Sequence, residues 1–225
     1  ESEFPQELDP EYFSAIFETT EFGIDARVFA ARLREALDRE DRIRLWTETT
    51  VLSVTENNRS GYDLNLEVDG DRQSEWYSDV INATWHRRLP LDRPLGIRPP
   101  APWSHRYKFG NRIMIPLHPD EIPSCTCVQG PFGDIVNYRE NGLFLSWYPT
   151  GRTGMSTVES PPDWHQAYTS EERMDVFQRS FDQWLRRCPA LAKLPWDADR
   201  VDPNGGFIYA LGESDVDDPR SRLHD

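Results

Sequence analysis

The sequence predicts an α+β fold: a mixed, mostly antiparallel sheet with helices on one side. Three observations support this prediction. Apolar and polar residues alternate strictly over 62–68, as they do in a half-buried strand. Short β-prone runs between 104 and 148 are separated by Gly, Pro and Asn, which is typical of an antiparallel meander. Two segments, 25–39 and 171–187, instead repeat their apolar residues at helical spacing.

The first predicted helix spans 25–39. Asp25 is suited to cap its N-terminus, because a carboxylate can accept hydrogen bonds from the free backbone N–H groups of the first turn. We expect the apolar face of this helix to be buried against the sheet; the face consists of Val28, Phe29, Leu33, Ala36 and Leu37.

An antiparallel ribbon is predicted after this helix. Two short β-prone runs, 43–46 and 50–55, precede the alternating strand. The sequence DGD at 69–71 is typical of a hairpin turn, and the next strand is expected to run from about residue 75 to residue 84. That strand would end in VINAT, at 80–84, directly before Trp85 and the charged residues that follow it.

The second half of the chain is predicted to be rich in strands. Prolines at 90, 94, 99, 100 and 102 first make a connector that cannot be a central strand, because proline donates no ladder hydrogen bond. Strands are then expected over 104–109, 112–117, 124–129, 135–138 and 143–148. A last strand is expected within 205–212, where glycines flank it.

The second predicted helix has clear start and stop signals. Thr169 and Glu172 have the spacing of a capping box, and Cys188-Pro189 ends the pattern. We expect its apolar face to pack against the sheet; the face consists of Met174, Phe177, Phe181, Trp184 and Leu185.

Composition limits the classes of partner. The 225 residues carry a formal net charge of −14, and no segment concentrates Lys and Arg, which argues against a nucleic-acid partner. No apolar run approaches the roughly 18 residues of a membrane span, and no secretory leader is recognisable. The chain begins without Met and stops directly after a motif-like stretch, so we expect a piece of a longer protein.

The cysteines and histidines do not form a metal-binding pattern. Cys125 and Cys127 would point to one face of a strand, where a disulfide between them would be strained. The five histidines are scattered, so no metal site is expected. The three cysteines are better explained as reduced, packed residues of a cytoplasmic protein.

The order of four segments carries a family resemblance: FGIDARVFAARLREAL, TTVLSV, DVINAT, and the tail GGFIYALGESDVDDPRSRLHD. In this order they resemble the FAD-dependent amino-acid and amine oxidase family, the group that contains D-amino-acid oxidase and glycine oxidase. The resemblance implies three parts: a remnant of the FAD-binding domain over 1–85, a substrate-binding domain over 86–204, and a return towards the FAD domain over 205–225.

The same resemblance implies FAD as the cofactor and nominates residues beside it. Val51 would contact the adenosine side, and Asn82, Ala83 and Thr84 would run beside the dinucleotide. Trp85 stands where the family usually has glycine, which adopts conformations that a bulky residue does not reach easily. The alternative is that Asn82 and Thr84 only satisfy backbone groups at a strand end. The phosphate-binding G-x-G-x-x-G loop is not in this sequence.

The substrate implied by the family is an amine, amino acid or related small molecule, oxidised by hydride transfer to the flavin. Such enzymes often hold a substrate carboxylate with an arginine and a tyrosine, because the guanidinium fork fixes orientation as well as charge. The candidates are Arg106, Tyr107, Lys108, Tyr148 and Arg152. Strand alternation predicts that Arg106 and Lys108 share a face and that Tyr107 takes the other. No motif nominates a catalytic acid or base.

A function from a different class also fits the sequence. The aromatic-rich meander could form a β-rich binding module without enzymatic activity, in which Trp103, Trp147 and Trp164 line a ligand groove.

Overall fold

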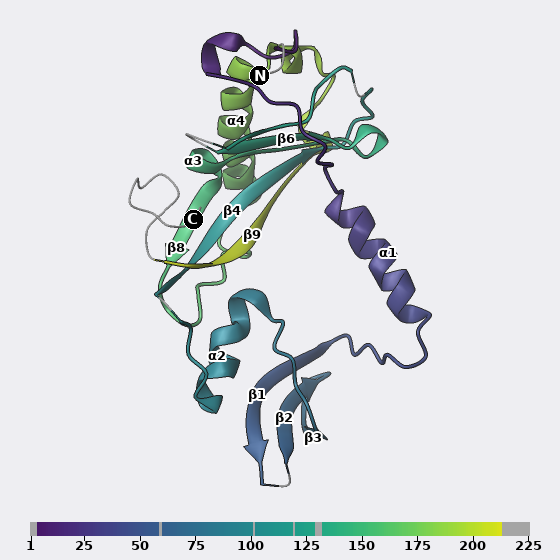
Figure 1. Ribbon diagram of the computed structural model, residues 1–225, viewed down its shortest axis with the longest axis vertical. Coiled ribbons are helices and arrows are strands. Elements are labelled where there is room, and N and C mark those ends of the chain that lie inside the picture. Colours follow the sequence, from purple (N-terminus) through teal and green to yellow (C-terminus); the bar gives the residue numbers. More distant parts are fainter. Residues whose placement is uncertain (1–3, 59, 101, 119, 129–131, 213–225) are drawn as a thin grey trace.

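Two antiparallel sheets of unequal size carry the fold (Figure 1). The computed structural model describes residues 4–58, 60–100, 102–118, 120–128 and 132–212. Helices and strands are mixed and every strand pairing is antiparallel in this part of the chain, so the predicted α+β class is confirmed.

The smaller sheet contains β1 (Thr49–Asn57), β2 (Gly61–Val68) and β3 (Asp71–Tyr77), in that order. Asp69 and Gly70 join β2 to β3 with φ values of 51° and 86°, the left-handed conformation that a tight hairpin requires. Val54 and Leu66 are each 3% exposed on this sheet. The short helix α2 (Arg88–Asp92), which buries Leu89 and Leu91, contacts β1. The predicted hairpin is confirmed.

Two predicted strands of the N-terminal third are wrong. Residues 43–46 form no strand, and β3 ends at Tyr77 rather than at residue 84. Ile81, which had suggested a buried strand, is 91% exposed, and Ile43 is 47% exposed. A β-prone run becomes a strand only where a neighbouring strand accepts its hydrogen bonds, and neither run has such a neighbour among the described residues.

The larger sheet is built around β4 (Trp103–Ile113), which pairs with β9 (Val201–Leu211) along its whole length. On its other side β4 pairs with β8 (Arg152–Ser156) and then with β7 (Leu143–Trp147). β6 (Gly133–Asn137) and β5 (Cys125–Cys127) continue from β7 to the edge. The predicted strands 104–109 and 112–117 are wrong as separate elements, since one strand runs through to residue 113. β8 was not predicted, because its short polar sequence RTGMS has no apolar alternation.

The long helix α4 (Ser170–Arg187) covers one face of the larger sheet (Figure 1). The capping box between Thr169 and Glu172 is present. Phe177, Phe181 and Trp184 are buried against the sheet, and Trp184 Nε1 donates to the backbone oxygen of Ser146 at 2.7 Å. The prediction for this helix is confirmed.

The helix α1 (Ala26–Asp38) forms as predicted, with Asp25 as its N-cap, but the prediction that its apolar face is buried is wrong. No residue of α1 is buried, and Phe29 is 59% exposed. Figure 1 shows α1 leading away from the larger sheet, with only its N-terminal end beside it. Polar contacts hold that end: both guanidinium nitrogens Nη1 and Nη2 of Arg112 donate to Asp25, and Tyr138 Oη donates to the backbone oxygen of Ile24 at 3.1 Å.

The remaining helical elements are single turns: α3 (Tyr148–Gly151) and the 3-10 turns Pro10–Tyr12, Trp85–Arg87, Arg93–Leu95, Arg139–Asn141, Pro189–Lys193 and Ala198–Arg200. The stretch from residue 85 to residue 95 is therefore helical, in agreement with its prediction as a non-strand connector.

Candidate functional site

The face of the larger sheet opposite α4 carries a group of charged side chains. In β4 the odd-numbered Tyr107 and Phe109 point towards α4 and belong to the core. Arg106 and Lys108 therefore point to the other face, because successive strand residues alternate. The predicted division of these residues between two faces agrees with this geometry.

Five residues from four elements meet there, and we call them the polar cluster: Arg106, Lys108, Asp134, Ser146 and Tyr148. Arg106 Nη1 donates to Tyr148 Oη at 3.4 Å. Lys108 Nζ lies 3.7 Å from Asp134 Oδ2 and 5.4 Å from the centre of the Tyr148 ring. Ser146 Oγ donates to Asp134 Oδ2 at 2.8 Å.

Arg152 borders the polar cluster. It is the first residue of β8 and the direct cross-strand partner of Lys108, at a point where the register between β4 and β8 shifts. The one-turn helix α3 separates Arg152 from Tyr148 by only three residues. Four of the five substrate candidates named from the sequence thus lie at one place on the sheet: Arg106, Lys108, Tyr148 and Arg152.

A hollow of about 330 Å³ adjoins the polar cluster, and both Asp134 and Tyr148 contribute to its wall. The other lining residues come from β5, β6 and the residues beside them: Thr126, Cys127, Val128, Phe132 and Gly133. A small molecule in this hollow would therefore contact the Asp134 carboxylate and the Tyr148 ring at the same time.

Burial affects the charged residues of this region. Arg106 is only 2% exposed, and burial lowers the pKa of Lys108, an effect that the nearby Asp134 partly opposes. Lys108 lies beside the Asp134 carboxylate, with Nζ 3.7 Å from Oδ2. A cation in such a partly desolvated place is stabilised by a nearby carboxylate.

Asp134 and Ser146 were not identified from the sequence. The alternation in GDIVN and LFLSW could have identified them, because the apolar Ile135 and Leu145 in these segments point to the core. Their neighbours Asp134 and Ser146 must then face the other side, directly opposite one another in the β6–β7 ladder.

Tyr107 lies apart from the polar cluster. It is fully buried among the rings of Phe109, Tyr168 and Phe207, and its hydroxyl lies 3.0 Å from His165 Nδ1. Burial raises its pKa. A fully buried phenol surrounded by aromatic rings serves packing in this structure.

The nominated cofactor residues Asn82 and Thr84 organise their own segment. Asn82 Nδ2 donates to Asp92 Oδ1 at 2.7 Å and to the backbone oxygen of Arg88 at 3.1 Å. Thr84 Oγ1 donates to Asn82 Oδ1 at 2.6 Å. Both side chains are thus engaged within the chain and fasten residues 82–84 to α2. Ala83 and Thr84 are exposed, and Asn82 is half-buried.

Val51, the other nominated cofactor residue, lies in β1 of the smaller sheet. It pairs with Leu66, and the register shifts directly after it, between Val51 and Ser53. Its side chain is half-buried.

Trp85 adopts the backbone conformation that glycine would supply. Its φ is 54°, in the left-handed region, and its indole Nε1 donates to the backbone oxygen of Phe207 at 2.8 Å. His86 stacks on the Phe207 ring, with ring centres 3.9 Å apart. The backbone at Trp85 therefore has a conformation that glycine reaches easily and other residues adopt rarely.

The three tryptophans considered for a binding groove are not together. Trp147 is 3% exposed and packs edge-on against Trp184, and Trp164 is 9% exposed and packs near Tyr107. Trp103 lines a hollow at the other end of β4.

All three cysteines are free, and Cys125 and Cys127 pack against the same core. Burial raises the pKa of the Cys125 thiol to about 12 and that of Cys188 to about 11, so both are protonated thiols at neutral pH. Within the described residues no three His, Cys, Asp or Glu side chains are grouped to hold a metal ion. No helix in the same part of the chain is long and apolar enough to cross a bilayer.

Comparisons with known proteins give structural neighbours only. No protein-family model matches the chain, and no curated protein matches it. One similar solved structure is CmlS, a flavin-dependent halogenase, with a TM-score of 0.45 and 14% identity over 82% of this chain and 32% of that chain. Another is the ternary complex of aklavinone-11 hydroxylase with FAD and aklavinone, with a TM-score of 0.42 and 15% identity over 72% of this chain and 28% of that one. The chain thus spans about a third or less of each neighbour. Both neighbours are flavin-dependent enzymes, and neither is an amino-acid oxidase.

Proposed function

We propose that this chain is the substrate-binding part, with an adjoining piece of the cofactor-binding part, of an FAD-dependent oxidoreductase. Its substrate would be an amine, amino acid or related small molecule that carries a carboxylate. The observation that supports this most directly is the meeting of Arg106, Lys108 and Tyr148 beside Arg152.

The polar cluster would orient the substrate. A guanidinium donates two parallel hydrogen bonds to a carboxylate, and the Tyr148 hydroxyl can donate a third. Arg106 is nearly buried, so an ion pair with it is screened little by water. Lys108 already lies near Asp134 and over the Tyr148 ring, and would add charge without the planar fork.

For the cofactor, the backbone of residues 82–84 and Val51 would contact the dinucleotide. The left-handed Trp85 keeps the chain path that such a contact needs, while the side chains of Asn82 and Thr84 hold the segment on α2. Bound FAD would supply the oxidant, accepting a hydride from a substrate carbon. This chain would contribute orientation of the substrate and exclusion of water, and we assign no acid or base.

The domain roles follow from the same proposal. Residues 1–85 would belong to the cofactor side, residues 86–204 to the substrate side, and residues 205–225 to the return towards the cofactor side. β9, which covers 201–211, pairs fully with β4, so the substrate sheet would lead directly into that return.

The test is to purify the longest natural protein that contains this chain, under gentle conditions, and to record its visible spectrum before and after FAD is added. Flavin absorbance that anaerobic addition of amino acids or amines bleaches is the expected result. A panel that pairs each carboxylate with its methyl ester tests the role of the polar cluster. No flavin absorbance in either state would contradict the proposal and favour the β-rich binding module. Equal bleaching by acids and esters would contradict only the carboxylate.

A further inference from the structure

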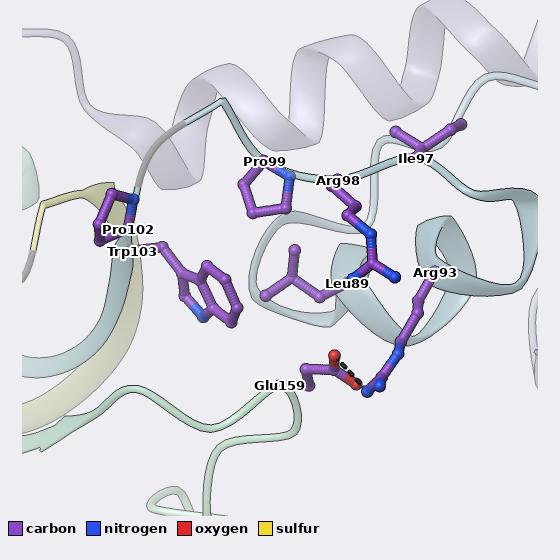
Figure 2. A pocket seen from close by; sticks show the side chains of 8 residues that line it. All are labelled: Leu89, Arg93, Ile97, Arg98, Pro99, Pro102, Trp103 and Glu159. Atoms are coloured by element: carbon purple, nitrogen blue, oxygen red, sulfur yellow. Dashed lines mark hydrogen bonds and ion pairs between the residues drawn. The ribbon is translucent and has the colours of Figure 1, made fainter.

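We propose that a second hollow, at the start of β4, binds a small planar aromatic anion. The hollow has a volume of about 410 Å³ and lies between α2, the connector that follows it, and the loop that carries Glu159 (Figure 2). It is formed by residues other than those of the polar cluster. Nothing in the proposed oxidoreductase function assigns it a role, and the proposal does not depend on that function.

The walls of the hollow are mostly apolar. Leu89, which is 4% exposed, forms the base, and the side chains of Ile97, Pro99, Pro102 and Trp103 surround it. Figure 2 shows the Trp103 indole on one side, with its flat ring system beside Leu89. Ligand pockets of about 300–1,000 Å³ with apolar and aromatic walls hold small organic molecules, so a body of one or two fused rings has room here. Aromatic rings favour offset or edge contact with such a wall.

The charged groups lie on the side opposite Trp103. Arg93 Nη1 donates to Glu159 Oε1 at 2.6 Å, which joins the connector to a loop 66 residues later. This contact neutralises both of those charges. Arg98 reaches inward from the connector (Figure 2) and has no carboxylate partner within the part of the chain that the structure describes.

Together these features define the ligand class. Two arginines and one glutamate leave the hollow with one excess positive charge, in a protein whose formal net charge is −14. An anionic group would therefore be drawn to Arg98 rather than to most other surfaces of the protein. The apolar body attached to it would lie against Trp103 and Leu89. The Trp103 indole N–H is covered and has no acceptor within the described residues, so a polar atom of the ligand that reached it would also satisfy this donor.

The experiment is a titration of the 225-residue chain with 2-naphthoate, in which calorimetry and saturation-transfer NMR detect binding. We expect 2-naphthoate to bind saturably at one site. The uncharged 2-naphthol should bind more weakly by about tenfold or more, since it cannot form the charge-assisted hydrogen bond. Arg98→Gln should weaken 2-naphthoate binding by about the same factor and leave 2-naphthol unchanged.

Two further variants complete the test. Trp103→Leu removes the aromatic wall and should weaken both compounds. Arg34→Gln, which removes an exposed arginine on α1 far from the hollow in sequence, should change neither. Because Arg98 is exposed, its replacement should leave the melting temperature unchanged, which confirms that the variant is folded.

Three outcomes would overturn the proposal. One is unsaturable 2-naphthoate binding up to millimolar concentration. Another is equal affinity of the wild-type chain and Arg98→Gln. The third is a loss of binding in Arg152→Gln but not in Arg98→Gln, since the probe would then occupy the polar cluster. None of these readouts involves flavin, so failure here is distinct from failure of the oxidoreductase proposal.

Discussion

Gly205 and Gly206 are neighbours in β9, yet they face opposite sides of the larger sheet. Gly205 lies opposite Phe109, and a side chain there would collide with the ring of Tyr107, which is fully buried. Gly206 lies opposite Lys108, and a Cβ added to it would meet nothing within 4 Å. Neither residue needs a left-handed backbone. Gly205 is therefore required for packing, and Gly206 is not.

We predict that Gly205→Ala lowers the free energy of unfolding by about 1–3 kcal/mol, because a buried aromatic ring would have to shift. Gly206→Ala, the matched control, should be neutral or stabilising by about 0.5–1 kcal/mol, since alanine restricts the unfolded chain. Urea denaturation of both variants measures the difference. Equal stability of the two would mean that Tyr107 does not occupy the space beside Gly205.

A second prediction at this scale concerns the polar cluster in the flavin-containing protein. Arg152→Lys should lower kcat/KM by about ten- to a hundredfold with flavin content unchanged, because lysine keeps the charge and loses the planar fork. Tyr148→Phe should cost less, since it removes one hydrogen bond to the carboxylate where the arginine fork donates two. Steady-state kinetics beside flavin occupancy measures both effects.

The control for this pair is Arg186→Lys, on the exposed side of the last turn of α4, which should keep wild-type kinetics. If Arg152→Lys also kept wild-type kinetics, Arg152 would not hold the substrate.

At the scale of elements, α1 is held at its N-terminal end by polar contacts, which include those of Asp25 with Arg112, of Tyr138 with Ile24 and of Arg27 with Asp202. The Asp25 carboxylate accepts hydrogen bonds from the backbone N–H of Arg27 at 3.0 Å and from Arg112, whose side chain is 7% exposed. The hydrogen bond from Arg112 holds the pKa of Asp25 below its usual value, although burial opposes this. Since no residue of α1 is buried, these contacts rather than packing hold the helix beside the sheet.

We predict that Asp25→Ala destabilises the protein by about 3–5 kcal/mol, because the nearly buried Arg112 is left without its partner. Amide hydrogen exchange over 26–38 should accelerate by more than it does in the rest of the chain. Glu35→Gln, which affects only exposed contacts with Arg32 and Arg39, should stay within about 0.5 kcal/mol of wild type. Unchanged exchange in Asp25→Ala would show that something else anchors α1.

The same carboxylate gives a pH dependence. Because the pKa of Asp25 is lower in the folded state, its contribution to stability is fully present above about pH 4 and is lost as the pH falls through the folded pKa. The stability difference between the wild-type protein and Asp25→Asn should therefore shrink as the pH is lowered below about 4. A difference that stays constant down to pH 2 would rule out this linkage.

At the scale of the whole molecule, the chain offers little to a pyrophosphate. A dinucleotide fold binds that group with a glycine loop and the N-terminus of a helix, whose free N–H groups and dipole favour negative charge. The sequence has no such loop, and the net charge of −14 repels an anion at long range. We predict that the 225-residue chain alone binds FAD weakly or not at all. Titration calorimetry that gave a micromolar or tighter Kd would contradict this.

Much of the fold could be predicted because it depends on local patterns. The alternation in β2, the turn at Asp69 and Gly70, and the capping box of α4 each follow from interactions within a few residues. For α4, the predicted helix and the predicted burial of its apolar face are both confirmed. For α1, the predicted helix is confirmed, but the prediction that its apolar face is buried is wrong. An amphipathic pattern specifies a face suited to burial, but another surface must be present to bury it.

The candidate site was predictable only in part. Alternation alone placed Arg106 and Lys108 on one face and Tyr107 on the other, since strand geometry depends on nothing distant. The contact of Arg106 with Tyr148, 42 residues later, depends on how β4, β7 and β8 pair, and Asp134 enters only through that pairing.

By itself the sequence determined the α+β class, the helices at 26–38 and 170–187, and the side of β4 to which each charged residue points. Each of these follows from backbone periodicity and from hydrogen bonds between near neighbours. Only the tertiary structure decided that residues 78–84 leave the sheet and that Trp85 takes a left-handed conformation held by Phe207. It also decided that Lys108 and Ser146 meet at Asp134. These depend on register and on contacts between segments far apart in the chain, which no local pattern encodes.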